Sequence, residues 1–248
     1  MNTGYLANSH STHFGGIYEL HSPDFTLALL CAALSTATYA SSLYLVQGLP
    51  GRDLAAATDP AFPVDVLINE EVCYQRGLAL GTIAGPLTLF PGPYNVKVSI
   101  ANSLAPCTNS PLIDTTVSIE AKADSSAVIA LSESGTPTLL TFENNLSPVP
   151  ANMARILFAN AADSPAVQVI LQNATTKKLY TYAVNREALL DVYLPAGSYT
   201  AVINEGSSTL VPSTFLNLYA QSATLLYAVG QVKNNTLILE TKTLRDVN

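Results

Sequence analysis

Apolar and polar residues alternate along most of this 248-residue chain, and the alternating runs are rich in Val, Ile, Leu, Thr and Tyr. Successive side chains of a strand point to opposite faces of a sheet, so a period of two predicts strands with one buried face. After residue 40, no segment combines a long 3.6-residue period with helix caps. The pattern therefore predicts an all-β protein.

The predicted strands fall into two groups of similar layout. The first group is predicted at 43–48, 63–69, 78–83, 86–90, 94–100, 113–120, 127–131 and 138–142. The second is predicted at 154–160, 166–172, 178–184, 189–194, 198–203, 216–219, 223–229 and 236–244. Turn residues recur every 8–12 positions, which is typical of a sandwich, and the repeat of about 100 residues is the size of one immunoglobulin-like domain.

The predicted architecture is therefore two tandem immunoglobulin-like (Greek-key) β-sandwich domains that follow an N-terminal signal-like segment. The first module is assigned to residues 41–143 and the second to 153–248. Residues 144–152 between them are polar, contain two prolines and are interpreted as a fairly stiff linker.

One corner recurs in both modules and is interpreted as the turn of a hairpin. Its first copy contains Pro91 and Gly92, and its second contains Pro195 and Gly197. The position of glycine after proline favours a type II turn in the first copy and a type I turn in the second. Positive φ is accordingly expected at Gly92 and not at Gly197.

A tyrosine follows each corner, Tyr94 in the first module and Tyr199 in the second. Both are interpreted as corner tyrosines, with the ring in the core and the hydroxyl bonded to a backbone carbonyl. The alternative is an aromatic platform for sugar binding.

The N-terminal segment predicts export. Residues 25–40 form an apolar run that ends in the small-x-small sequence Thr38-Tyr39-Ala40, so residues 1–40 are interpreted as a signal peptide or prepeptide. The preceding residues lack Lys and Arg, and an uncleaved short helix or anchor is the alternative. The run is shorter than the ~18–20 apolar residues of a membrane span. The mature chain is expected to be secreted, periplasmic or on the cell surface, without a transmembrane span.

Cleavage at that point would remove every histidine of the chain, because His10, His13 and His21 all lie before residue 40. Histidine-based triads and histidine metal sites then become unavailable. No phosphate-binding loop is found, and the adjacent pair Glu70 and Glu71 would point to opposite faces of a strand. We expect no enzyme activity, no catalytic residues, no cofactor and no metal.

Charge argues against nucleic acid as a partner. Charged residues make up only 12% of the chain, the net charge is −7, and no basic cluster occurs. Phosphate backbones are bound mainly through clustered Lys and Arg.

Two cysteines remain after the predicted cleavage, Cys73 and Cys107, and an even pair in an exported chain favours a disulfide. Two unlinked buried thiols are the alternative. Asp65, Glu70 and Glu71 form the densest acidic group of the first module. A calcium site is conceivable there, but the spacing matches no calcium loop, so the group is interpreted as a solvated strand end.

Several stretches resemble the domain-of-unknown-function 4397 family: P-V-D-V-L-I-N at 63–69, G-T-I-A-G-P-L-T-L-F-P-G-P-Y at 81–94, A-R-I-L-F-A-N-A-A-D-S-P-A-V-Q-V at 154–169 and Y-L-P-A-G-S-Y at 193–199. The resemblance implies tandem β-sandwich modules of a secreted or cell-envelope protein. It also implies a cysteine at the places of Cys73 and Cys107, and an acid where this chain has Gln168. It implies no catalytic residue.

Three functions remain open. The leading hypothesis is a non-catalytic exported module of the envelope or extracellular space, with a structural, adhesive or binding role. The second is a carbohydrate-binding or exopolysaccharide-processing accessory protein, and the third a fibre subunit assembled through edge strands. Cell-surface polysaccharide and envelope proteins are the expected partners, and the sequence leaves the oligomeric state open.

Overall fold

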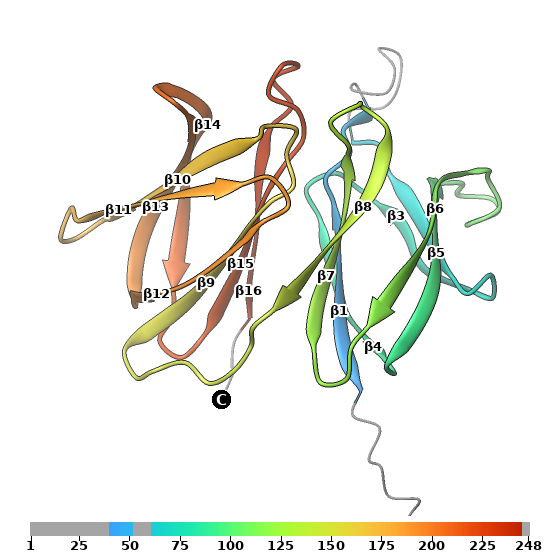
Figure 1. Cartoon of the computed structure of the whole chain (residues 1–248), viewed down its shortest axis with the longest axis horizontal. Coiled ribbons are helices and arrows are strands. Elements are labelled where there is room, and N and C mark those ends of the chain that lie inside the picture. The colour runs from blue at the N-terminus through green and yellow to red at the C-terminus, as the bar shows by residue number, and fades with distance from the viewer. Residues whose placement is uncertain (1–39, 52–60, 245–248) are drawn as a thin grey trace, which may run out of the picture. The chain divides into compact units, whose positions relative to one another are not determined.

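A computed structural model describes residues 40–51 and 61–244, which form sixteen strands in four four-stranded sheets (Figure 1). The predicted signal segment, with its three histidines, lies outside the described residues except for Ala40. In the described part of the chain, no helix is long and apolar enough to cross a membrane.

The first eight strands pair into two sheets of order β4-β1-β7-β8 and β3-β2-β5-β6. Their bounds are β1 (Ser41–Gln47), β2 (Val64–Ile68), β3 (Val72–Leu78), β4 (Ile83–Leu89), β5 (Gly92–Ile100), β6 (Pro111–Ile119), β7 (Asp124–Leu131) and β8 (Pro137–Asn144).

The last eight strands repeat the same order, in sheets β12-β9-β15-β16 and β11-β10-β13-β14. Their bounds are β9 (Met153–Asn160), β10 (Ala166–Asn173), β11 (Leu179–Asn185), β12 (Leu189–Pro195), β13 (Gly197–Glu205), β14 (Ser208–Leu218), β15 (Ala223–Val229) and β16 (Ile238–Leu244). In both sheet pairs one inner pairing is parallel, β1 with β7 and β9 with β15, and the others are antiparallel.

The all-β class and the arrangement as two sandwich-like pairs of sheets are confirmed. We call the pairs formed by β1–β8 and β9–β16 the first and second sandwich. The immunoglobulin-like Greek-key assignment stays a prediction.

Each sandwich encloses its own apolar core. Strand β10 shows how the alternating pattern builds it, since Val167, Val169 and Leu171 are at most 1% exposed while Gln168 and Ile170 between them are partly exposed. The core of the second sandwich includes these three residues, and an equivalent core in the first includes Val64, Val66 and Ile68.

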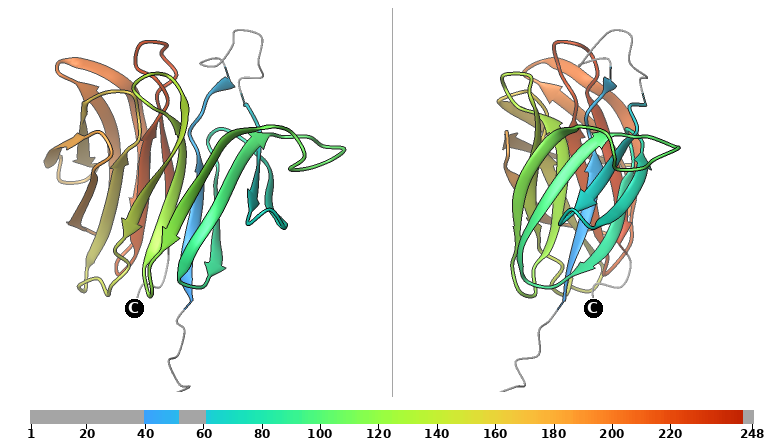
Figure 2. Two further views of the ribbon diagram at one scale, coloured as in Figure 1. Left: turned by 45° about the vertical axis from the view of Figure 1, so that its right-hand side comes forward. Right: turned by 90° about the vertical axis from the view of Figure 1, so that its right-hand side faces the viewer.

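Strands β1, β9 and β15 break the alternation, because nearly all of their residues are buried. A third apolar cluster explains this pattern: it contains residues of both sandwiches and lies between sheets β4-β1-β7-β8 and β12-β9-β15-β16 (Figure 2). Its buried members are Tyr44, Val46, Val128, Ala130, Phe142, Leu157, Ala159, Ala161, Leu225, Tyr227 and Val229. We call this cluster the inter-sandwich core.

The sheets approach so closely there that glycine is required at one position. A Cβ atom on Gly48 would lie 2.5 Å from the Cβ of Val229 in the other sandwich. Hydrogen bonds also connect the two sandwiches there. The buried hydroxyls of Ser126 and Tyr227 form a hydrogen bond with each other, and the Asn144 amide donates to the Ser126 hydroxyl at 2.6 Å. Burial raises the pKa of Tyr227, so this phenol stays neutral.

Two strand predictions were wrong. The predicted strand 78–83 contains the turn between β3 and β4, where the Thr82 N–H donates to the Ala79 carbonyl. The strand before it, β3, was missed because Gln75, Arg76 and Gly77 interrupt its apolar residues, and of its seven residues at the sheet edge only Leu78 is buried. Strand β14 begins at Ser208, eight residues before the predicted start at 216, and contains Pro212 within its length.

Candidate functional site: two grooves along the sandwich seams

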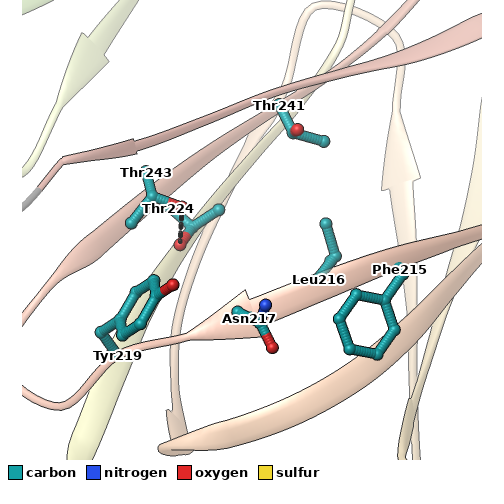
Figure 3. A pocket seen from close by; sticks show the side chains of 7 residues that line it. All are labelled: Phe215, Leu216, Asn217, Tyr219, Thr224, Thr241 and Thr243. Carbon is teal, nitrogen blue, oxygen red and sulfur yellow. Dashed lines mark hydrogen bonds between the residues drawn. The ribbon is translucent and has the colours of Figure 1, made fainter.

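A groove lies where the two sheets of the second sandwich meet along β14 and β16 (Figure 3). Its volume is about 340 Å³, and Phe215, Leu216, Asn217, Tyr219, Thr224, Thr241 and Thr243 line it. Strands β14, β15 and β16 supply these side chains; they follow one another in the chain, but β14 belongs to one sheet and β15 and β16 to the other.

The alternation of β14 gives the groove its aromatic character. Leu216 and Leu218 point into the core and are 5% and 3% exposed, so Phe215 and Asn217 face outward. Phe215 is 61% exposed, and Tyr219, just beyond the strand, is 44% exposed.

The opposite wall is built of threonines, among which the Thr224 and Thr243 hydroxyls lie 3.5 Å apart. On the aromatic side, the Ser198 hydroxyl donates to Asn217 Oδ1 at 3.0 Å, which holds that side chain in place. No residue lining this groove carries a charge.

The first sandwich has a smaller groove at the equivalent place, with a volume of about 210 Å³. Strand registers establish the equivalence: Gly92 pairs with Ile119 as Gly197 pairs with Leu218, and Ser125 pairs with Glu143 as Thr224 pairs with Thr243. The lining residues are Val117, Ser118, Glu120, Ala123, Ser125, Thr141, Phe142 and Glu143. This groove therefore carries two carboxylates, and its one ring, Phe142, is only 5% exposed.

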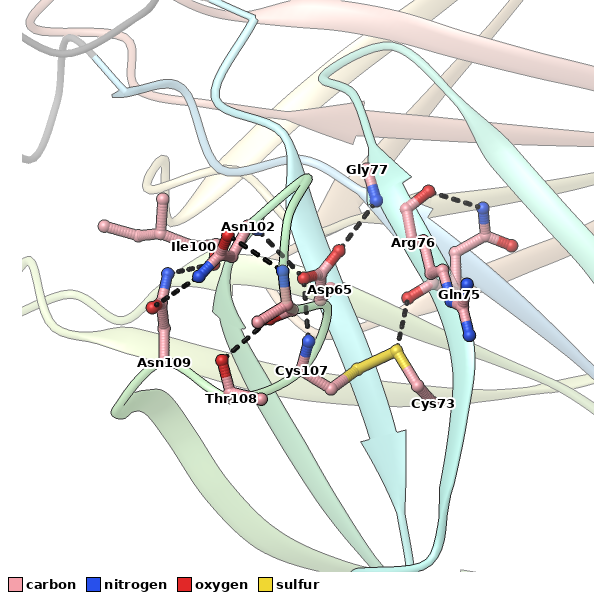
Figure 4. Close-up of a disulfide and its surroundings, with 11 residues drawn as sticks. Asp65, Cys73, Gln75, Arg76, Gly77, Ile100, Asn102, Cys107, Thr108 and Asn109 are labelled. Atoms are coloured by element: carbon pink, nitrogen blue, oxygen red, sulfur yellow. Dashed lines mark hydrogen bonds between the residues drawn. A yellow bond between two sulfur atoms is a disulfide. The ribbon is translucent and has the colours of Figure 1, made fainter.

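The two cysteines of the first sandwich form a disulfide, as predicted, with their Cα atoms 5.9 Å apart. The bond ties edge strand β3 to the loop that follows β5 (Figure 4). Beside it lies a recess of about 530 Å³, lined by Pro63, Asp65, Arg76, Gly77, Ala101, Asn102, Ser103 and Pro106.

The interpretation of Asp65 as part of a solvated strand end was wrong, because this side chain is only 1% exposed. Its Oδ1 accepts the Gly77 N–H at 2.9 Å, and its Oδ2 accepts the N–H groups of Asn102 at 3.1 Å and Cys107 at 2.9 Å (Figure 4). A buried carboxylate is tolerated when such donors satisfy it. Asp65 thus fastens the same loop as the disulfide.

The rest of that acidic group faces solvent. Glu70 accepts a hydrogen bond from Lys97 Nζ at 2.6 Å, which raises the pKa of Lys97, and Glu71 is exposed. Among the described residues, no group of three or more His, Cys, Asp or Glu is placed to hold a metal ion.

The recurring corner joins the two sheets of each sandwich, so its interpretation as a hairpin was wrong. Strand β4 pairs with β1, whereas β5 pairs with β2 and β6, and β12 and β13 are separated in the same way. The Tyr94 hydroxyl donates to the Phe90 carbonyl at 2.8 Å, and the Tyr199 hydroxyl donates to the Pro195 carbonyl at 2.9 Å. Tyr199 is fully buried and Tyr94 partly buried.

The expectation that only Gly92 has positive φ was also wrong, since φ is 146° at Gly92 and 153° at Gly197. Each glycine begins a strand and stands two residues before its tyrosine. The two corners are therefore equivalent at the glycine and the tyrosine. They differ at the proline, since Pro91 directly precedes Gly92 whereas Pro195 lies two residues before Gly197.

A buried arginine organises the segment between the sandwiches. Arg155 Nη1 donates to the backbone carbonyls of Asn145 and Ser147, both at 2.8 Å. Its Nε lies 3.1 Å from Asp191 Oδ1, and its guanidinium lies over the Tyr193 ring, 4.7 Å from the centroid. The polar linker predicted at 144–152 is thereby fastened to the second sandwich.

A family model described as domain of unknown function (DUF4397) matches residues 54–170. This match, which covers slightly less than half of the chain, confirms the resemblance to that family. The match begins before β2 and ends within β10, so it covers most of the first sandwich and only the start of the second. A comparison with curated proteins finds no match to this chain.

Among solved structures, the chain is similar to the Bacillus anthracis TIE protein, with 12% identity and a TM-score of 0.26, over 78% of this chain and 34% of that one. It is also similar to a leucine-rich repeat protein from Bacteroides thetaiotaomicron, with 13% identity and a TM-score of 0.20, over 78% and 26% of the two chains. A candidate cell adhesion protein from Bacteroides uniformis matches with 10% identity and a TM-score of 0.25, over 83% and 98%. The chain thus spans about a third of the length of the TIE protein and about a quarter of the length of the leucine-rich repeat protein.

Sequence reasoning missed the residues that line the two grooves. Phe215 lies outside the predicted strand 216–219, and the threonines look like ordinary solvent-facing strand residues. One signal was available: Phe215, Asn217 and Tyr219 alternate with leucines that predict the buried face.

Proposed function

We propose that this chain is a non-catalytic module of the cell envelope or extracellular space that acts in adhesion or structural support. The single observation that carries the proposal is the inter-sandwich core, which joins the two sandwiches by eleven buried apolar residues. Domains within a chain that must move relative to each other usually meet through smaller, more polar interfaces. A module that bridges surfaces benefits from such a fixed connection.

The polar chemistry of the described residues supports the same proposal. Asp65 is engaged by three backbone N–H groups, and Arg155 by the linker carbonyls and Asp191. Both groups are thus occupied in holding loops. The disulfide suits an oxidising compartment outside the cytoplasm.

Co-sedimentation tests the proposal. Purified residues 41–248 are mixed with isolated cell envelopes of the source organism, and the bound fraction is measured against protein concentration. We expect saturable binding and no hydrolysis of nitrophenyl ester or glycoside substrates above the buffer rate. Substrate turnover that a single substitution abolishes would contradict the non-catalytic proposal, and an envelope-bound fraction no larger than that of an unrelated β-sandwich would contradict the adhesive one.

A fibre subunit is a second candidate, because one sheet edge suits strand addition. Edge strand β11 pairs with β10 through seven consecutive residues without a register shift, whereas the equivalent edge β3 has two shifts and the disulfide. A proline at Thr181, an exposed residue at the centre of β11, would block pairing there. We expect concentration-dependent assembly in sedimentation velocity that Thr181→Pro abolishes; a monomer at all concentrations would rule the candidate out.

A further inference from the structure

We propose that the groove of the second sandwich binds a neutral oligosaccharide, with sugar rings stacked on Phe215 and Tyr219 and hydroxyls bonded to Asn217 and the threonine wall. This goes beyond the proposed function, which requires no particular ligand. The inference rests on the exposure of the aromatic rings, their spacing, the absence of charge and the contrast with the equivalent groove.

Both rings are exposed at the surface of the sandwich, Phe215 to 61% and Tyr219 to 44%. On β14, Leu216 and Leu218 point to the buried face, and Phe215 points to the solvent-facing side. Large apolar side chains that gather at the surface, framed by polar groups, mark binding sites. An aromatic ring presents a negative face, which attracts the weakly positive C–H groups on one side of a pyranose.

The spacing of the rings suits a chain of sugars. Residues two apart on one strand face are separated by about 6.6 Å, so fully extended backbone from 215 to 219 would place these two positions roughly 13 Å apart at most. Figure 3 shows Phe215 and Tyr219 at the two ends of the row, with Asn217 between them. A single monosaccharide cannot contact both rings, whereas an oligosaccharide can.

The polar groups of the groove are those that recognise uncharged hydroxyls. Asn217 is held through its Oδ1 by Ser198, and amide and hydroxyl groups can both donate and accept hydrogen bonds. The groove is lined by no cation that would pair with a carboxylate or sulfate, and the whole chain has a net charge of −7. Anionic polysaccharides are therefore disfavoured.

The first sandwich contains an internal comparison for this site. By strand register, Thr116, Ser118 and Glu120 stand where the second sandwich has Phe215, Asn217 and Tyr219. The same backbone therefore lacks both rings and carries acids instead. The shared strand order therefore does not require exposed rings at this place, and the rings distinguish the second groove from the first.

Isothermal titration calorimetry with neutral hexasaccharides tests the inference. The probes are maltohexaose, cellohexaose, xylohexaose and chitohexaose, each titrated into residues 41–248. We expect at least one to bind with a Kd below about 1 mM, and Phe215→Ala and Tyr219→Ala each to weaken it about tenfold, as one lost stacking contact would. Phe90→Ala is the matched control, because Phe90 is 62% exposed but does not line this groove.

Each outcome decides the inference. Absence of binding for all four probes up to 10 mM would overturn it, as would equal weakening by Phe90→Ala or unchanged affinity in both groove variants. Circular dichroism shows that the variants are folded. Tighter binding of oligogalacturonate than of every neutral probe would overturn the neutral class. If saccharide binding fails while envelope co-sedimentation persists, the inference is wrong and the proposed function stands.

Discussion

The two sandwiches share one strand order. They differ in the contacts that fasten the loop after β5 in the first sandwich and the equivalent loop after β13 in the second. In the first, buried Asp65 and the Cys73–Cys107 disulfide fasten the loop after β5. In the second, Gln168 stands at the place of Asp65, since Val66 pairs with Val98 as Val169 pairs with Ile203. The same strand order is therefore compatible with an end that carries a disulfide and with one that does not.

The grooves differ in the opposite sense. The first sandwich has an acidic groove without an exposed ring, and the second has an uncharged groove with two exposed rings. With the proposed saccharide site, the comparison suggests a division of roles, in which the first sandwich carries the stabilising cross-link and the second carries the binding groove. The following substitutions test that division.

Removal of the disulfide should have the largest effect. Replacing both cysteines by alanine opens a loop of 34 residues, which in the chain-entropy model lowers the free energy of unfolding by about 3–4 kcal/mol. Urea denaturation followed by circular dichroism measures the loss. Thr181→Ala, on the equivalent edge strand β11, is the control and should change it by less than about 0.5 kcal/mol. A loss below about 1 kcal/mol for the cysteine pair would refute the stabilising role of the disulfide.

Asp65→Ala should cost about 3 kcal/mol, because three backbone N–H groups lose a charged acceptor. Gln168→Ala at the equivalent position should cost less than about 1 kcal/mol, since Gln168 is partly exposed. The same urea titration compares the two. Similar losses in both variants would show that the two ends are held alike.

Glu240 should make stability fall between about pH 4.5 and pH 7. It is 8% exposed, and burial raises the pKa of its carboxyl from 4.5 to about 7. In that window the unfolded chain has released the proton and the folded chain still holds it. The free energy of unfolding is therefore highest at low pH and falls by at most about 3 kcal/mol as the pH rises.

The position equivalent to Glu240 is Leu140, since Thr141 matches Thr241. Glu240→Leu should therefore remove this pH dependence and raise the free energy of unfolding by about 2 kcal/mol at pH 8. Melting temperatures from pH 4 to pH 8 measure both effects. A slope that persists in Glu240→Leu would assign the pH dependence to another group.

The two corner glycines should give the smallest and most equal effects. Both have positive φ, and an added Cβ would meet nothing within 4 Å at Gly92 and only ordinary contacts, 3.5 Å and beyond, at Gly197. Gly92→Ala and Gly197→Ala should each cost about 1–2 kcal/mol through backbone strain alone. Thermal melts that differ by more than about 1 kcal/mol between the two variants would show that the corners are not equivalent.

Local patterns were sufficient to predict much of the fold. The alternation of β10 predicted a strand with one buried face, and the even pair of cysteines predicted the disulfide. Each of these features depends on residues close in sequence, or on one pair whose chemistry is distinctive.

The features that the sequence did not predict depend on contacts between distant segments. Asp65 looks like a surface acid until the loop containing Asn102 and Cys107 folds over it. The second groove combines a row on β14 with threonines of β15 and β16; these strands are consecutive, but they belong to two sheets, and the local pattern does not show how those sheets meet. The inter-sandwich core was not predicted for the same reason, because it combines residues of both sandwiches. Its formation explains why β1, β9 and β15 have buried residues on both faces.

The division of roles between the sandwiches is tested most directly by one NMR titration. Residues 41–248 are titrated with the hexasaccharide that binds in calorimetry, or with all four in a mixture, and amide shifts are followed at both grooves. We predict saturable shifts at Phe215, Asn217 and Tyr219 and none at the equivalent Thr116, Ser118 and Glu120. Equal shifts in both grooves, or shifts at neither, would contradict it.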